Sequence, residues 1–240
     1  MIQGLTLALM EVLLTNNYQP DLIFGGLRLG EPVIALTSLI MALVCLVAWF
    51  RLQKLAIVHP ELVYFRLFFL LMGISAFLGS VVGHLFLYLL PFAFKVPGWM
   101  LGMVALAALA QASIYRNARI GNGVYTQKLS WLNSLSLLAA SFWLIGAIWF
   151  PIVEFHAAFG LFSLILPLEW SLFQKTGNET SRYMLWGIGL LVSAVLFHIG
   201  KISLGVWFSF FDFAHLIMCS AFWCFLLGAE ATAGTTNQRL

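Results

Sequence analysis

Four of the five histidines lie inside long apolar runs, where an ionisable side chain is costly and is therefore a candidate for function. They are His84, His156, His198 and His215. Ser80 comes four residues before His84, and Asp212 comes three before His215, so each pair shares one face of a helix. Imidazoles and a carboxylate can converge on a metal, and a nearby hydroxyl could assist hydrolysis by metal-activated water. The alternative for each histidine is a hydrogen bond to a neighbouring helix.

The amino-acid composition indicates whether these residues lie in a soluble or a membrane protein. Of the 240 residues, 62% are hydrophobic and 9% are charged, whereas soluble domains have about a quarter charged residues. The mean hydropathy is +0.98, so lipid must cover much of the apolar surface. The net charge of +3 comes without a basic stripe, so nucleic acid is not an expected partner.

Seven apolar runs are each close to the roughly 20 residues that a membrane-spanning helix needs. They cover residues 32–50, 65–90, 97–115, 129–149, 152–173, 183–203 and 207–228. The sequence therefore predicts an all-α polytopic membrane bundle of seven transmembrane helices over residues 31–228. Residues 1–30 would form an N-terminal outer or interfacial segment, with a short helix in the first fourteen residues, and residues 229–240 a cytoplasmic tail.

The basic residues predict the orientation of these spans. With the N-terminus outside, nine basic residues fall on the inner side and three on the outer side, which is the usual positive-inside bias. The inner residues are Arg51, Lys54, Arg66, Arg116, Arg119, Lys128, Lys175, Arg182 and Arg239, and the outer ones are Arg28, Lys95 and Lys201. The C-terminus would be cytoplasmic. Short loops and the lack of a targeting segment favour a bacterial inner membrane.

This topology places all four buried histidines at one depth. At 1.5 Å per residue they lie roughly 6–12 Å below the outer boundary, and Asp212 shares their layer. The inner halves of the spans, by contrast, carry almost no ionisable groups. We therefore expect one polar layer near the outer face of an otherwise apolar bundle.

Three short stretches resemble alkaline ceramidases. Residues 78–84 (LGSVVGH) resemble the Ser-x-x-x-His signature of their second helix, residues 31–41 (EPVIALTSLIM) resemble the entry to their first helix, and residues 211–218 (FDFAHLIM) resemble the histidine-bearing start of their seventh. Alkaline ceramidases belong to a wider superfamily of seven-span hydrolases that includes the progestin and adipoQ receptors. Span number and orientation agree with that layout.

The resemblance implies an intramembrane zinc held by three histidines, with a serine and an aspartate assisting hydrolysis of a lipid amide. Ser80, His84 and His215 match family positions, whereas Phe211 and Lys95 stand where the family has a histidine and an aspartate. On this basis the predicted metal ligands are His84, His215 and His198, and the predicted catalytic residues are Ser80 and Asp212. Asp212 is an alternative to His198 as the third ligand.

Three functions follow from these observations. The first is a divergent member of the alkaline ceramidase-like superfamily, a zinc-dependent hydrolase acting on a membrane lipid. The second is a non-catalytic protein on the same scaffold, such as a receptor, a lipid-binding protein or an assembly factor, motivated by Phe211 and Lys95. The third is haem binding by pairs of histidines. A retinal protein is disfavoured because the last span has no lysine, and a transporter because polar residues do not continue through the full depth.

Overall fold

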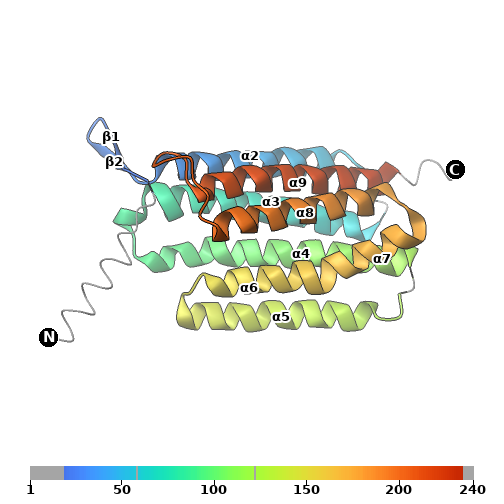
Figure 1. Ribbon diagram of the computed structural model, residues 1–240. Helices are drawn as coiled ribbons and strands as arrows, with labels where there is room; N and C mark the ends of the chain where they lie inside the picture. Colours follow the sequence, from blue (N-terminus) through green and yellow to red (C-terminus); the bar gives the residue numbers. More distant parts are fainter. Residues whose placement is uncertain (1–18, 58, 122, 235–240) are drawn as a thin grey trace.

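The computed structural model describes residues 19–57, 59–121 and 123–234. Within them, seven helices are long and apolar enough to cross a membrane, which confirms the predicted number of spans. The protein is therefore an integral, multi-pass membrane protein. Figure 1 shows the helices running side by side along one direction as a single bundle.

The helical elements occur in the predicted order. They are α2 (Pro32–Gln53), α3 (Pro60–Leu78) continued by the π-helix η1 (Gly79–Leu85), the short 3₁₀ turns η2 (Leu87–Leu89) and η3 (Phe92–Lys95), α4 (Val96–Ile120), α5 (Thr126–Ala147), α6 (Pro151–Phe159), the π-helix η4 (Gly160–Ile165), α7 (Leu166–Thr176), α8 (Glu179–Ile199) and α9 (Phe210–Gly234). Pro32, Pro60 and Pro151 open α2, α3 and α6. Proline suits the first turn because its missing N–H would have no helical partner there.

Several predicted boundaries shift. The second span begins at Pro60 and ends at Leu85, five residues earlier at both ends than predicted. The last helix runs to Gly234, six residues beyond the predicted boundary at 228. The helix predicted in the first fourteen residues lies outside the described residues. The segment before α2 holds a small antiparallel hairpin of β1 (Leu22–Phe24) and β2 (Leu27–Leu29), a minor departure from an all-α chain.

The bundle has a densely packed side and a looser side. In Figure 1, α2, α3, α8 and α9 gather on the side away from α5, and α4, α6 and α7 lie between these four helices and α5. The core contains fully buried aromatic side chains from α3 and α9. The Phe68 ring meets those of Phe222 and Phe225 edge-on at 5.6 and 5.9 Å between centroids, an arrangement that aromatic quadrupoles favour. This core separates the two ends of the bundle.

We name the two ends by their polar residues. The histidine end holds the start of α2, η1 and the start of α9, and the arginine end holds the end of α4, the end of α7 and the start of α8. At the arginine end Arg116 and Glu169 form an ion pair in which both side chains are almost fully buried. The Ser181 hydroxyl donates to the same carboxylate at 2.7 Å, and Arg119 pairs with the buried Glu61 at 2.6 Å.

The expectation that the inner half of the bundle carries almost no ionisable groups is therefore wrong. The helices extend further than the apolar runs, so Glu61 and Arg116 lie within helices rather than in loops. Glu169 lies within a predicted span, and its charge is tolerated because Arg116 and Ser181 face it. Pairing between helices is the condition under which charges are kept inside a membrane bundle.

The contact between α8 and α9 depends on a glycine. A Cβ atom at Gly187 would lie 2.3 Å from the ring of Phe225, which is fully buried, whereas a Cβ atom at Gly189 would meet nothing within 4 Å. We expect Gly187→Ala to destabilise the purified protein by about 1–3 kcal/mol, the usual cost of overpacking. Gly189→Ala on the same helix is the control and should not lower the thermal unfolding temperature. Equal unfolding temperatures for the two variants would show that α8 and α9 are not packed this closely.

The buried ion pair at the arginine end gives a second prediction. Arg116→Met should destabilise the protein by about 3–5 kcal/mol, because it leaves the Glu169 carboxylate buried without its cation. Arg182→Met is the control, since Arg182 pairs with Glu179 at the surface and such pairs contribute about 0–1 kcal/mol. Thermal unfolding in detergent measures both. A stable Arg116→Met protein would contradict the buried pair.

Candidate functional site

The carboxylate of Asp212 is the centre of the histidine end. It is fully buried, and four donor groups lie within hydrogen-bond distance of its two oxygens. One oxygen accepts from the Gln19 amide at 2.8 Å and from the backbone N–H and hydroxyl of Ser209 at 2.7 and 2.8 Å. The other lies 3.1 Å from the Thr37 hydroxyl. A buried carboxylate needs this many donors to remain charged away from water.

Gln19 connects this carboxylate to the start of α2. Its side-chain oxygen accepts from the backbone N–H groups of Val33 and Ile34, both at 3.0 Å. These two N–H groups belong to the first turn of α2 and have no partner within the helix. Glu31, the residue before the helix, supplies no side-chain cap. A glutamine twelve residues earlier in the chain therefore caps α2 and joins it to α9.

The next link runs from Asp212 through Thr37 to His215. The Thr37 hydroxyl lies 3.0 Å from Nδ1 of His215 and 3.0 Å from the carbonyl of Ile34. A hydroxyl has one proton to donate, and both the carboxylate and the carbonyl can only accept. Thr37 therefore donates to one of these oxygens and accepts the Nδ1–H of His215. In the neutral ring this leaves Nε2 of His215 as an acceptor.

His84 is held in a comparable way. Its Nδ1 lies 2.7 Å from the carboxylate of Glu31, so this nitrogen carries a proton and donates it, and Nε2 faces away from the carboxylate. Glu31 takes a left-handed backbone conformation with φ of 40°, which turns the chain from the hairpin into α2. The preceding Gly30 lets the two segments approach, because a Cβ atom there would lie 2.9 Å from the carbonyl of His84.

Ser80 and His84 share one helix face, as predicted, but that face is turned towards α2. The Ser80 hydroxyl donates to the carbonyl of Ala35 at 2.8 Å, four residues after the Glu31 that pairs with His84. One turn further along, Ser38 donates to the carbonyl of Ala76 at 3.0 Å. These contacts form a series of hydrogen bonds along the interface of α2 with α3 and η1. Ser80 is thus buried in this interface rather than placed beside the imidazoles.

The histidines do not all meet. The rings of His84 and His215 lie 6.5 Å apart between centroids. The Phe211 ring contacts both His84 and His198, at 6.5 and 5.0 Å between centroids, and the nearest carboxylate to His198 is that of Glu154 at 3.9 Å. His156 lies on α6, which packs mainly against η4, α5 and α4. The predicted layer therefore divides: His156 lies apart, whereas His84 and His198 both lie close enough to His215 to interact with it electrostatically.

These residues do not fit the three-histidine zinc site that the resemblance implies. Across residues 19–57, 59–121 and 123–234, no group of three histidine, cysteine, aspartate or glutamate side chains could hold a metal ion. The carboxylate of Asp212 is already surrounded by donors, and the aromatic ring of Phe211 cannot ligate. What remains is a pair of imidazoles, His84 and His215, whose Nδ1 atoms are fixed by oxygen partners and whose Nε2 atoms can accept hydrogen bonds.

Sequence reasoning found the two imidazoles and Asp212 but missed three residues that orient them. Glu31 is expected only at the edge of the polar layer and in the resemblance, Thr37 is one hydroxyl in an apolar run, and Gln19 lies outside every predicted span. The signal for Thr37 is that a hydroxyl lies within two turns of the start of the first span, near the depth of the polar layer. For Gln19 no pattern in the sequence gives its partners.

The comparisons with known proteins concern the whole bundle rather than this site. No similar curated protein and no similar solved structure was found for this chain. One protein-family model matches residues 33–233, from the start of α2 nearly to the end of α9. The chain therefore belongs to DUF6962, a family of unknown function.

Proposed function

We propose that this protein is a divergent member of the alkaline ceramidase-like superfamily that recognises a membrane lipid through His84 and His215. The observation that carries the proposal is the fixation of both Nδ1 atoms, by Glu31 at 2.7 Å and by Thr37 at 3.0 Å. Metal-ligating histidines are generally oriented in this way through their other ring nitrogen, and the same fixation orients Nε2 for recognition of a lipid. The three ceramidase-like stretches contribute His84, Glu31, Thr37 and His215 to the same site.

The polarity of the two nitrogens defines the class of lipid. Nε2 of a neutral imidazole that donates from Nδ1 accepts hydrogen bonds, so the neutral pair is suited to a ligand with hydroxyl or amide N–H donors. An N-acyl sphingoid lipid has both. A triacylglycerol has only acceptors, and its carbonyl oxygens would face two nitrogens without a proton to donate. The amide of the first class is also the group that the resemblance implies as substrate.

The proposal places the histidine end outside the cytoplasm, because the basic residues concentrate towards the other end. The lipid would then enter from the outer leaflet, and the arginine end and C-terminus would face the cytoplasm. A bacterial inner membrane suits this arrangement. Labelling of single cysteines introduced in the β1–β2 hairpin and in the loop between α7 and α8 would test the orientation.

Lipid recognition by this pair predicts which lipid the protein binds and which variants lose that binding. The purified full chain should bind a short-chain N-acyl sphingosine in preference to a short-chain triacylglycerol. His84→Ala and His215→Ala should each weaken binding roughly tenfold, which corresponds to one lost hydrogen bond of about 1.4 kcal/mol. Binding can be measured from the quenching of tryptophan fluorescence in detergent micelles.

His156→Ala is the matched control, because His156 lies on α6, which packs mainly against η4, α5 and α4 rather than against α2 or α9. This variant should bind like the wild type. An equal loss in all three histidine variants would assign the effect to folding. Equal binding of the two lipids would contradict the proposed ligand class.

A second candidate function is hydrolysis of the same lipid amide, and the fixed Nδ1 atoms favour it too. When bound, zinc would supply an activated water. Alkaline ceramidases hold that zinc with three histidines, whereas His84 and His215 supply two imidazoles here. Such a hydrolase would contain near-stoichiometric zinc, release fatty acid from N-acyl sphingosine, and lose activity in Ser80→Ala. We expect none of these, since the Ser80 hydroxyl is donated to Ala35.

Two measurements distinguish lipid recognition from hydrolysis: elemental analysis of protein purified without any chelator, and chromatography of released fatty acid. Ser80→Ala that binds lipid like the wild type, with no fatty acid released by either protein, supports recognition without cleavage. Zinc at one ion per chain together with turnover would replace recognition by hydrolysis. A Soret absorption band in the same sample would instead indicate haem.

A further inference from the structure

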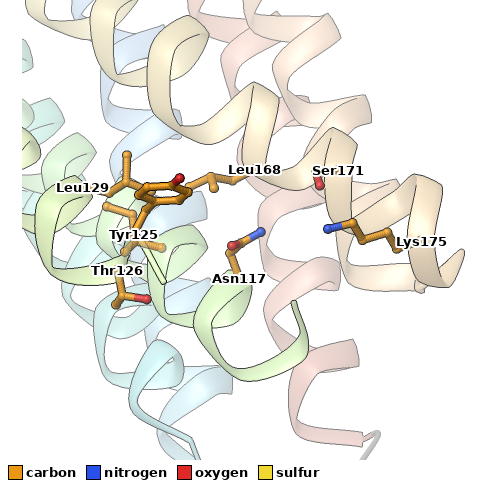
Figure 2. A pocket seen from close by; sticks show the side chains of 8 residues that line it. Asn117, Tyr125, Thr126, Leu129, Leu168, Ser171 and Lys175 are labelled. Atoms are coloured by element: carbon orange, nitrogen blue, oxygen red, sulfur yellow. The ribbon is translucent and has the colours of Figure 1, made fainter. Parts of the chain in front are cut away.

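A polar cavity lies at the arginine end, at the far end of the bundle from the histidines. It has a volume of about 230 Å³ and is lined by α4, the start of α5 and α7. The lining residues are Ile114, Asn117, Tyr125, Thr126, Leu129, Leu168, Ser171 and Lys175. Figure 2 shows the Lys175 ammonium group and the Asn117 amide pointing towards the same space from opposite sides, with the Ser171 hydroxyl beside the Lys175 ammonium group.

The lining has the polarity of an anion site. Lys175 is the single charged residue among the eight, and no carboxylate lines the cavity. Asn117 and Ser171 add neutral donors beside it. Within the described part of the chain no ion pair involves Lys175, whereas Arg116, Arg119 and Arg51 at the same end are all paired with glutamates. The positive charge of Lys175 is therefore available to a ligand.

The other side of the cavity is apolar. Ile114, Leu129 and Leu168 form this part of the lining, and the Tyr125 ring lies beside the latter two in Figure 2. Tyrosine at the end of a spanning helix is typical of the membrane–water boundary. An ion of free phosphate would gain nothing from these apolar groups, whereas the glycerol and first acyl carbons of a phospholipid would pack against them.

We propose that this cavity binds the anionic headgroup of a phospholipid from the leaflet at the arginine end. The phosphate lies between Lys175, Asn117 and Ser171, and the glycerol backbone contacts Leu129 and Leu168. The cavity is smaller than the roughly 300–1,000 Å³ of sites that enclose a whole drug-sized ligand. It therefore takes the headgroup alone and leaves the acyl chains in the bilayer. This site is separate from lipid recognition by His84 and His215.

The test uses the full chain in nanodiscs of phosphatidylcholine with and without phosphatidylglycerol. Native mass spectrometry of the released protein measures which lipid it retains. The wild type should retain phosphatidylglycerol in preference to phosphatidylcholine. In Lys175→Gln the ratio of retained phosphatidylglycerol to phosphatidylcholine should fall about fivefold, as expected for the loss of one cation near a charged headgroup. Asn117→Ala should also lower this ratio.

Lys54→Gln is the matched control, because it removes the same charge at the same end of the bundle from α2, outside the cavity. It should retain phosphatidylglycerol like the wild type. Equal losses in Lys54→Gln and Lys175→Gln would overturn the site in favour of general attraction to an anionic surface. Inorganic phosphate should not displace the lipid at moderate concentrations. Binding of inorganic phosphate without any preference for phosphatidylglycerol would also overturn the proposal.

Discussion

The burial of the Asp212 carboxylate is the constraint on which the histidine end depends. A charge in an apolar environment is stable only when several donors surround it, and here those donors come from three parts of the chain. Ser209 immediately precedes the same helix, Thr37 belongs to α2, and Gln19 to the segment before the β1–β2 hairpin. Satisfying one carboxylate thus fixes the relative positions of α2, α9 and the N-terminal segment, and with them the ring of His215.

Much of this arrangement could be predicted from the sequence. Apolar length gave the seven spans, and counting residues from the span ends gave a common depth for His84, His215 and Asp212, which the structure joins through Glu31 and Thr37. Depth alone does not give direction around the helix axis, however. His198 has the same predicted depth, and Phe211 contacts both His198 and His84, so His198 as the third metal ligand stays a prediction.

The partners of these residues could not be predicted for a different reason. A side chain such as that of Gln19 belongs to no repeating pattern, and its bonds to Asp212 and to α2 span 193 and 15 residues of sequence. The buried pair of Arg116 and Glu169 could not be predicted because Arg116 follows the apolar run 97–115, where charges are usually solvated, and nothing in the sequence identifies it as the partner of Glu169. In both cases the missing information is the packing of one helix on another, which periodicity does not contain.

The distribution of polar groups also bears on what kind of process the protein supports. Hydrogen-bonded clusters occupy both ends of the bundle, while Phe65, Phe68, Phe222 and Phe225 fill the core with fully or almost fully buried rings. A transporter needs polar groups at successive depths so that its substrate is never without partners. Among the described residues, the aromatic core itself contributes no polar side chain, and the hydrogen-bonded Gln111 and Asn133 lie between α4 and α5 instead. The two ligands proposed above accordingly use separate ends of the bundle. At the histidine end the proposed ligand donates hydrogen bonds, because Nε2 of a neutral imidazole held through Nδ1 is an acceptor.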